Sequence, residues 1–379
     1  MRHYRDRWRR LIRHRRESRI AGVRVGLHRS DIVRTGCLRM RMRSDLMDIF
    51  DPRPSTERAA WLARENLLHS QKSLDYLLDA CEGCLPDALH AASHDFLRSL
   101  SDDATTRASG LVFTAIWRLA NAIRRKDESE IHVVLTNLVM SSALSARSCR
   151  FLVGGTAGAC DADRNFLHGL GDDTYKTVFH DASPNAALAR MHTLDDCFRR
   201  LRDIDPVLHG EVAEIVNEIY LFEATTCHSR DTLYAGSDFH RLGCLYVNVI
   251  ATSKPAWFWL DKLVHESAHQ VMLSLMIHDE FVLNDDSERY TSPLRKEPRT
   301  VTGIYHAMFV VYRIVHCFRR TLATQRLTDA ERGYIADAIT QYQRKFVDAH
   351  HVLIEHGKLT AGAKHMLEQC RHLMQEVHA

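Results

Sequence analysis

The apolar positions between residues 256 and 275 recur at intervals of three and four, which is the spacing of one face of a helix. They are Trp257, Leu260, Leu263, Val264, Ala268, Val271, Met272 and Leu275. Pro255 suits the first turn of such a helix, where its missing amide proton costs no hydrogen bond. Upstream, residues 243–250 form a β-branched and apolar run that begins at a glycine, which is typical of a strand. The pattern therefore predicts a strand followed by a largely buried helix.

Most of the remaining chain also has helical patterning. Apolar spacing, capping residues and prolines predict helices over 55–81, 86–100, 105–126, 128–146, 183–204, 206–222, 302–318, 328–357 and from 360 towards the end of the chain. A short strand and turn is predicted over 150–158. We therefore expect a mainly α fold of the α+β class, with a helical N-terminal portion and a second helical portion that carries a small β-sheet.

Composition and charge suggest how the chain is divided. Its 379 residues, 45% of them hydrophobic, can bury a sizeable core. We expect an Arg-rich arm over 1–47, a helical N-terminal domain over 48–235 and a C-terminal domain over 236–379. Residues 1–43 hold 15 arginines and no lysine against three acidic residues, a net charge of +12, which leaves −9 for the rest of a chain whose total is +3.

The arginine block is typical of a disordered arm that could touch nucleic acid, an anionic membrane or an acidic peptide. Translation from Met40, Met42 or Met47 would remove it, so we assign it no function. No run of uncharged apolar residues reaches the roughly 18 of a membrane span. The ten cysteines are scattered without a disulfide-like spacing, which indicates a reducing compartment. We expect a cytoplasmic protein with neither a membrane nor a nucleic-acid partner, and the sequence sets no oligomeric state.

His265-Glu266-Ser267-Ala268-His269 is an H-E-x-x-H motif inside the predicted buried helix. Two histidines four apart project from one helical face, so both imidazoles can reach one metal ion, with Glu266 near the open coordination position. The alternative is a pair of core histidines satisfied by hydrogen bonds. The glutamate between them, and their position beside the apolar stripe, favour a mononuclear metal enzyme.

A third protein ligand would decide the class of metal enzyme. The metzincin pattern needs a histidine where this chain has Leu275 and a glycine where it has Met272, so that class is excluded. A thermolysin-like enzyme would use a downstream glutamate, but those within reach lie in a polar stretch typical of a loop: Glu280, Glu288 and Glu297. His306 is the better candidate, because it lies near the start of an apolar helix that can hold a ligand in register.

The segment between the two helices carries two prolines and two arginines. The prolines define a stiff extended loop, which delivers Arg295 and Arg299 just before His306. Arginine presents a fixed fork of donors suited to bidentate recognition of a carboxylate. An arginine near a three-ligand metal is what a 2-oxo acid cosubstrate would require. The alternative is that both arginines pair with glutamates of the same loop.

Together these motifs resemble the HExxH-type peptide modification proteins associated with ribosomally made peptide natural products. The resemblance covers about residues 240–315 and rests on H-E-x-x-H, on Ser292-Pro293-Leu294-Arg295 followed by Pro298-Arg299, and on Gly303-Ile304-Tyr305-His306-Ala307 at a helix start. Members are understood as iron(II)- and 2-oxoglutarate-dependent peptide β-hydroxylases. The resemblance implies that His265, His269 and His306 bind iron, and that Arg295 or Arg299 anchors 2-oxoglutarate.

The resemblance implies an oxygenase that uses Fe(II), 2-oxoglutarate and O2 to hydroxylate the β-carbon of a residue in a precursor peptide, which it could recognise through a leader sequence. Glu266 would then not be needed to activate water, and could orient a ligand or hold an iron-bound water. In the alternative, a zinc peptidase that binds Zn(II), Glu266 is the general base. A second alternative is a non-catalytic peptide-binding module. Tyr246, Asn248 and Tyr305 are candidates to line the pocket.

Overall fold

The fold is known from a computed structural model that describes residues 49–81, 83–100, 107–140, 144–145, 149–153, 177–226, 233–250, 254–294 and 297–376. Over these residues it contains ten α-helices and a small mixed sheet of five strands. The predicted mainly α fold with a small β-sheet is therefore confirmed. The arginine-rich arm and Arg295 lie outside the described residues.

Four helices form the N-terminal helical layer: α4 (Thr56–Ala80), α5 (Asp87–Ser99), α6 (Gly110–Arg125) and α7 (Glu128–Met140). The second half of α4 packs with the other three around one apolar cluster that includes Leu74, Ile116 and Leu135. The predicted start of α4 is confirmed, because the Ser55 side chain accepts a hydrogen bond from the amide of Arg58. A two-stranded ladder, β1 (Arg107–Ala108) with β2 (Leu144–Ser145), accompanies this layer.

The main sheet is organised around one central strand. Its strands are β3 (Arg150–Val153), β4 (Thr177–Asp181), β5 (Glu218–Thr226), β6 (Ala235–Ser237) and β7 (Cys244–Asn248). β5 runs parallel to β3 and β7, while β4 pairs antiparallel with its second half. β6 is antiparallel to β7 at the edge. Strands buried on both faces read as continuous apolar runs, which is why the run over 243–250 predicted β7 correctly.

The prediction of one helix over 206–222 is wrong in its second half. The helix α10 (Pro206–Ile215) ends after ten residues, and β5 begins at Glu218. Its start was well marked, because Asp205 caps it and Pro206 occupies the first turn. The following apolar run from Ile219 to Phe222 fits a helix or a doubly buried strand equally well, since periodicity does not distinguish them over so short a length.

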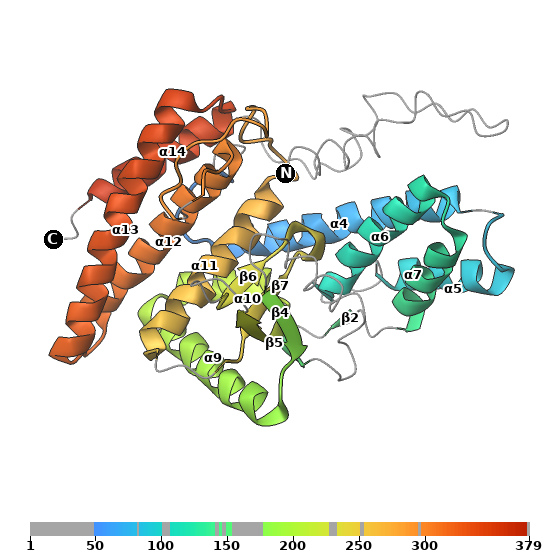
Figure 1. Ribbon diagram of the computed structural model, residues 1–379, viewed down its shortest axis with the longest axis horizontal. Helices are drawn as coiled ribbons and strands as arrows, with labels where there is room; N and C mark the ends of the chain where they lie inside the picture. Colours follow the sequence, from blue (N-terminus) through green and yellow to red (C-terminus); the bar gives the residue numbers. More distant parts are fainter. Residues whose placement is uncertain are drawn as a thin grey trace.

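The remaining helices enclose the principal core. They are α9 (Pro184–Ile204), α11 (Ala256–Leu275), α12 (Val301–Thr324), α13 (Asp329–His356) and α14 (Ala361–Gln375), with a 3-10 turn η2 at Phe239–Arg241. α11 lies at the centre of the molecule, between the layer of α12, α13 and α14 and the sheet (Figure 1). The predicted capping box at Thr328 and Glu331 is confirmed at the start of α13.

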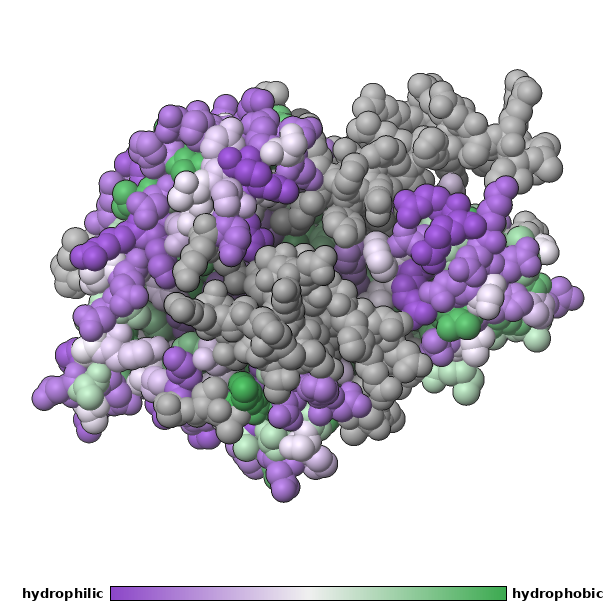
Figure 2. Space-filling view, viewed as in Figure 1, coloured by the Kyte–Doolittle hydropathy of each residue, from purple (hydrophilic) through white to green (hydrophobic). Residues whose placement is uncertain are grey.

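One helix, α12, is long and apolar enough to cross a membrane by length and composition alone. Within the described structure 89% of its most apolar window is buried against other parts of the chain. Its neighbours include α11, α13 and α14. The composition of α12 is therefore that of a central core helix. Over α13 and α14, Figure 2 shows a mainly hydrophilic surface with isolated apolar residues.

A buried ionic cluster joins the N-terminal layer to the principal core. Glu211 of α10 accepts from Arg58 of α4 at 3.0 Å and forms an ion pair with Arg313 of α12, and all three side chains are buried. Burial lowers the pKa of Arg313 to about 9. Removing Glu211 would leave two buried guanidinium groups without their shared carboxylate, which costs far more than an ion pair contributes. The principal core also includes residues on both sides of position 235, where the domain boundary is predicted.

Asp205 generates a prediction about stability and pH. It caps α10 by accepting from the amides of Val207 and Leu208, and its other oxygen accepts from His316 Nε2 at 2.8 Å. Burial alone would raise the pKa of its carboxyl, but the hydrogen bonds from His316 and from the Leu208 amide outweigh it and lower the pKa to about 2.

We expect Asp205→Ala to lower the free energy of unfolding at pH 7 by about 1–2 kcal/mol. Because the folded-state pKa lies below the value of about 3.9 in an unfolded chain, this stabilisation is complete above about pH 5 and is lost as the pH falls towards 2. Urea denaturation at several pH values measures it. Asp203→Ala is the control, since that side chain is 65% exposed. A difference that does not change with pH would contradict the assignment.

Candidate metal centre

The position of α11 on the sheet is fixed by one buried amide. Gln270 accepts from the backbone amide of Gly243 at 2.9 Å and donates to the carbonyl of Cys244 at 2.9 Å. These two backbone groups precede and begin β7, and Gln270 is fully buried. Gly243 has φ +81°, a conformation that favours glycine. Gln270 follows His269 directly, so this contact sets the register of the H-E-x-x-H residues against the sheet.

A second buried contact holds α11 one turn further along the same face. Ser274 Oγ donates to the carbonyl of Gln270 and accepts from Asn66 Nδ2 of α4 at 2.8 Å. All three side chains are buried. α11 is therefore held by polar contacts to β7 and α4 as well as by its apolar face. A ligand set carried on such a helix is held rigidly.

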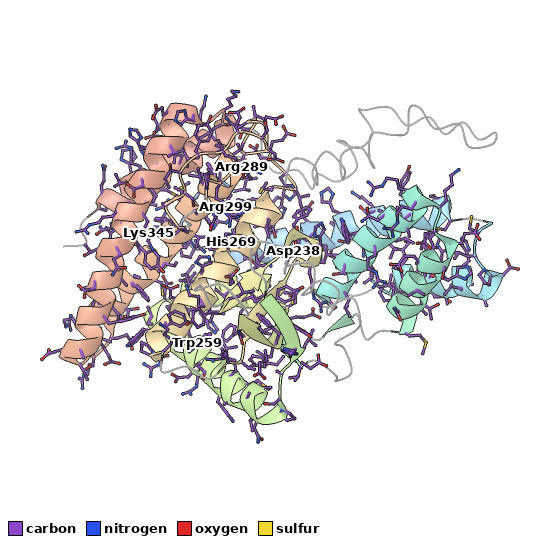
Figure 3. The ribbon with its side chains drawn as sticks, viewed as in Figure 1. Asp238, Trp259, His269, Arg289, Arg299 and Lys345 are labelled. Atoms are coloured by element: carbon purple, nitrogen blue, oxygen red, sulfur yellow. The ribbon has the colours of Figure 1, made fainter. Side chains whose placement is uncertain are left out.

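The H-E-x-x-H residues converge on one point. Single ligand atoms of His265, Glu266 and His269 all lie within 4.8 Å of one another. The carboxylate of Glu266 is buried, and its Oε1 lies 3.9 Å from His265 Nε2. Both histidines are partly exposed. Figure 3 shows His269 near the middle of the molecule, with Arg299 above it and Asp238 to its right in this view. Two imidazoles and a carboxylate are donors that suit a divalent transition metal.

Ser237 of β6 is a member of the site that the sequence analysis missed. Its hydroxyl donates to Glu266 Oε2 at 2.9 Å. In the sheet, Ser237 is paired with Leu245 of β7, whose side chain belongs to the principal core beside α11. Residues paired across an antiparallel ladder project to the same face, which brings Ser237 to α11. Only the register of β6, a three-residue strand with no apolar pattern, could have revealed this contact.

His306 lies beside His269, as the sequence analysis expected of a neighbouring helix. It belongs to α12, whose start is capped by Thr300. The rings of His269 and His306 are stacked with centroids 5.5 Å apart, and their Nδ1 atoms are 3.3 Å apart. On its other side, His306 Nε2 lies 3.0 Å from Met276 Sδ. Burial lowers the pKa of His306 to about 4, so the ring is neutral at pH 7.

Arg299 is the described member of the predicted cosubstrate pair. Its backbone forms two hydrogen bonds with Tyr290, at 2.8 and 2.9 Å, which close the loop between α11 and α12. A Cβ atom built on Gly303 would lie 3.6 Å from Cβ and 4.0 Å from Cδ of Arg299. The arginine stem therefore lies over Gly303. Gly303 and His306 are three residues apart on α12 and so share a face of the helix.

The glutamates of the loop are placed differently. Glu288 accepts from Asn284 Nδ2 at 2.8 Å, from Lys358 Nζ at 3.3 Å and from Tyr290 OH at 3.2 Å. These contacts attach the loop to the connection between α13 and α14. Glu297 is exposed. Glu288 thus has a structural role in the loop, in agreement with the prediction that these glutamates are poorly placed as ligands.

The three residues predicted to line a pocket are buried and make structural contacts. Tyr305 OH donates to the carbonyl of Ala363 at 2.8 Å, which ties α12 to α14. Asn248 donates to the carbonyl of Leu233 at 2.8 Å and accepts from the amide of Ile250. Tyr246 is fully buried and belongs to the small apolar cluster on the sheet, apart from the core that surrounds α11.

No protein-family model and no curated protein sequence matches this chain. The chemistry of the site therefore has to be argued from its own residues.

Gln270 generates a prediction about the attachment of α11. Gln270→Leu keeps a similar volume but leaves the buried amide of Gly243 and the buried carbonyl of Cys244 without their side-chain partner. An unsatisfied buried polar group costs about 1–3 kcal/mol. We expect the free energy of unfolding to fall by about 2–4 kcal/mol, measured by urea denaturation. Gln341→Leu on the exposed face of α13 is the matched control and should change it by less than about 0.5 kcal/mol.

Proposed function

We propose that this protein is a mononuclear iron(II) enzyme that uses 2-oxoglutarate and O2 to hydroxylate the β-carbon of a residue in a ribosomally synthesised peptide. The observation that carries the proposal is the convergence of His265, Glu266 and His269 within 4.8 Å on one rigid helix. A set of two histidines and one carboxylate with open positions is the donor set of many non-haem iron oxygenases. The substrate and a cytoplasmic location are part of the proposal.

Two side chains can complete the protein ligands of the ion. Glu266 already belongs to the converging group. His306 is the candidate implied by the family resemblance, and it stacks on His269. In either arrangement three protein ligands would leave positions for a bidentate cosubstrate and for dioxygen. Bound iron(II), with 2-oxoglutarate and O2, would supply the oxidising power that inserts oxygen into a C–H bond.

The chain's own residues would hold and orient the reactants. Arg299 precedes the start of α12, and by helical rise this start lies about 9 Å from His306. The positive end of the α12 dipole and a guanidinium fork both favour a carboxylate there. Gly303, which has no side chain, leaves space on this face for the Arg299 stem. Arg299 would therefore anchor the distal carboxylate of 2-oxoglutarate, with Arg295 of the same loop as the other candidate.

A zinc peptidase remains the alternative, favoured by the position of Glu266. Its Oε1 lies next to the two histidines, where a general base would take a proton from a metal-bound water. Ser237 would then hold this carboxylate by its second oxygen. If the purified protein binds no metal, the chain would instead be a peptide-binding module.

The first test is anaerobic addition of Fe(II) and then 2-oxoglutarate to the metal-free protein. The proposal predicts a visible charge-transfer band that requires both additions and is absent in His265→Ala and His269→Ala. Arg299→Ala should keep the band but raise the 2-oxoglutarate concentration for half-saturation roughly 10- to 100-fold, since a charged hydrogen bond is worth about 1.5–3 kcal/mol.

Arg326→Ala is the control, because that residue lies in the turn between α12 and α13. Tight stoichiometric zinc with no band, together with peptide cleavage that Glu266→Gln abolishes, would replace the oxygenase by the peptidase.

Gly303 generates a second prediction. Gly303→Ala places a methyl group at ordinary contact distance from Thr300 and Arg299, and should leave both the fold and cosubstrate affinity nearly unchanged. Gly303→Leu fills the space that the Arg299 stem occupies. We expect it to raise the 2-oxoglutarate requirement about as much as Arg299→Ala does, with Fe(II) affinity within about threefold of wild type, as read by titration of the band. If Gly303→Ala and Gly303→Leu gave the same 2-oxoglutarate requirement, Arg299 would bind no cosubstrate at this position.

A further inference from the structure

His269, His306 and Met276 form a series of contacts that leads away from the converging group. His269 Nδ1 lies 3.3 Å from His306 Nδ1, and His306 Nε2 lies 3.0 Å from Met276 Sδ. His306 is buried, whereas His265 and His269 are partly exposed. Within the described residues, the group that can share one ion contains His265, Glu266 and His269, and His306 is outside it. His306 thus contacts His269 of this group without belonging to the group itself.

The chemistry of Met276 favours one distribution of the ring protons between His269 and His306. A thioether sulfur accepts a hydrogen bond weakly and has no proton to donate. In a neutral imidazole one nitrogen donates and the other accepts, so if Nε2 of His306 donates to the thioether, its Nδ1 is the acceptor. In that arrangement the proton between the two Nδ1 atoms belongs to His269. This tautomer of His269 presents Nε2 as the nitrogen with a lone pair.

We infer that His306 is a positioning residue, which accepts the Nδ1–H of His269 and so presents His269 Nε2 to the metal, while Glu266 is the third ligand. Metal-bound histidines almost always donate their second nitrogen to an outer partner, which fixes the tautomer and the ring orientation. Here the partner would be another imidazole, itself fixed by Met276. The inference rests on the proposed metal centre and changes the role that the family resemblance implies for His306.

The contacts of Glu266 agree with its role as a metal ligand. One oxygen, Oε1, faces His265, and the other, Oε2, accepts from Ser237. A hydrogen bond to the second oxygen holds a carboxylate in the orientation that binds an ion through the first. The centre would then contain two imidazoles and one carboxylate, all from five consecutive residues of α11. Ser237 and His306 would hold this set from opposite sides, one from β6 and one from α12.

Pulsed EPR of the protein with substoichiometric Cu(II) tests the inference, because it counts the imidazoles bound to the ion. The inference predicts two coordinated imidazoles in the wild type. His265→Ala identifies any signal from other histidines. In His306→Gln, whose amide oxygen can accept the proton of His269, the count should stay at two and Cu(II) affinity should stay within about threefold of wild type. His306→Leu removes the acceptor and should lower the affinity roughly 10- to 100-fold, with the count still two.

Three imidazoles in the wild type, falling to two in His306→Gln, would overturn the inference and make His306 a ligand. Glu266→Gln gives a second criterion: it should weaken Cu(II) binding more than His306→Gln does, and equal affinity in wild type and Glu266→Gln would exclude Glu266 as a ligand. The measurement uses no 2-oxoglutarate. A two-imidazole centre in a protein that gives no charge-transfer band would therefore preserve the inference while removing the proposed function.

Discussion

The hydrogen bonds of Gln270 decide where the candidate site lies. They fix α11 against Gly243 and Cys244, so the neighbouring His265, Glu266 and His269 take one position relative to the sheet. A shift of α11 by one residue would turn these side chains by about 100° and away from their present partners. The same register brings Ser237 of β6 to Glu266 and places His269 beside His306 of α12. The whole constellation thus depends on the attachment of one helix to one strand.

The core around this helix is assembled from distant parts of the chain. Arg58, Glu211 and Arg313 meet inside it, and each comes from a different helix. Because Glu211 pairs with both arginines, the cluster forms only when α4, α10 and α12 pack together. α12 in turn carries His306. The ionic cluster therefore helps to determine the position of His306.

The sequence predicted local features well and long-range pairing poorly. The helix around the H-E-x-x-H motif, the strand before it and the capping box at Thr328 were evident, because each is encoded by residues within a few positions of one another. β5 was missed because its apolar run fits a helix equally well. Ser237 and Met276 were missed because only the tertiary structure brings them to Glu266 and His306. Tyr246 and Tyr305 were expected to line the pocket, but Tyr246 belongs to the small apolar cluster on the sheet and Tyr305 to the principal core.

We propose that His265, Glu266 and His269 hold one metal ion. An anomalous difference map at the iron absorption edge, from crystals grown anaerobically with Fe(II), tests it most directly. We expect a peak within bonding distance of His265, His269 and Glu266, with His306 in contact with His269 and not with the ion. Well-ordered crystals with no peak at this group, or with iron bound elsewhere on the chain, would contradict it.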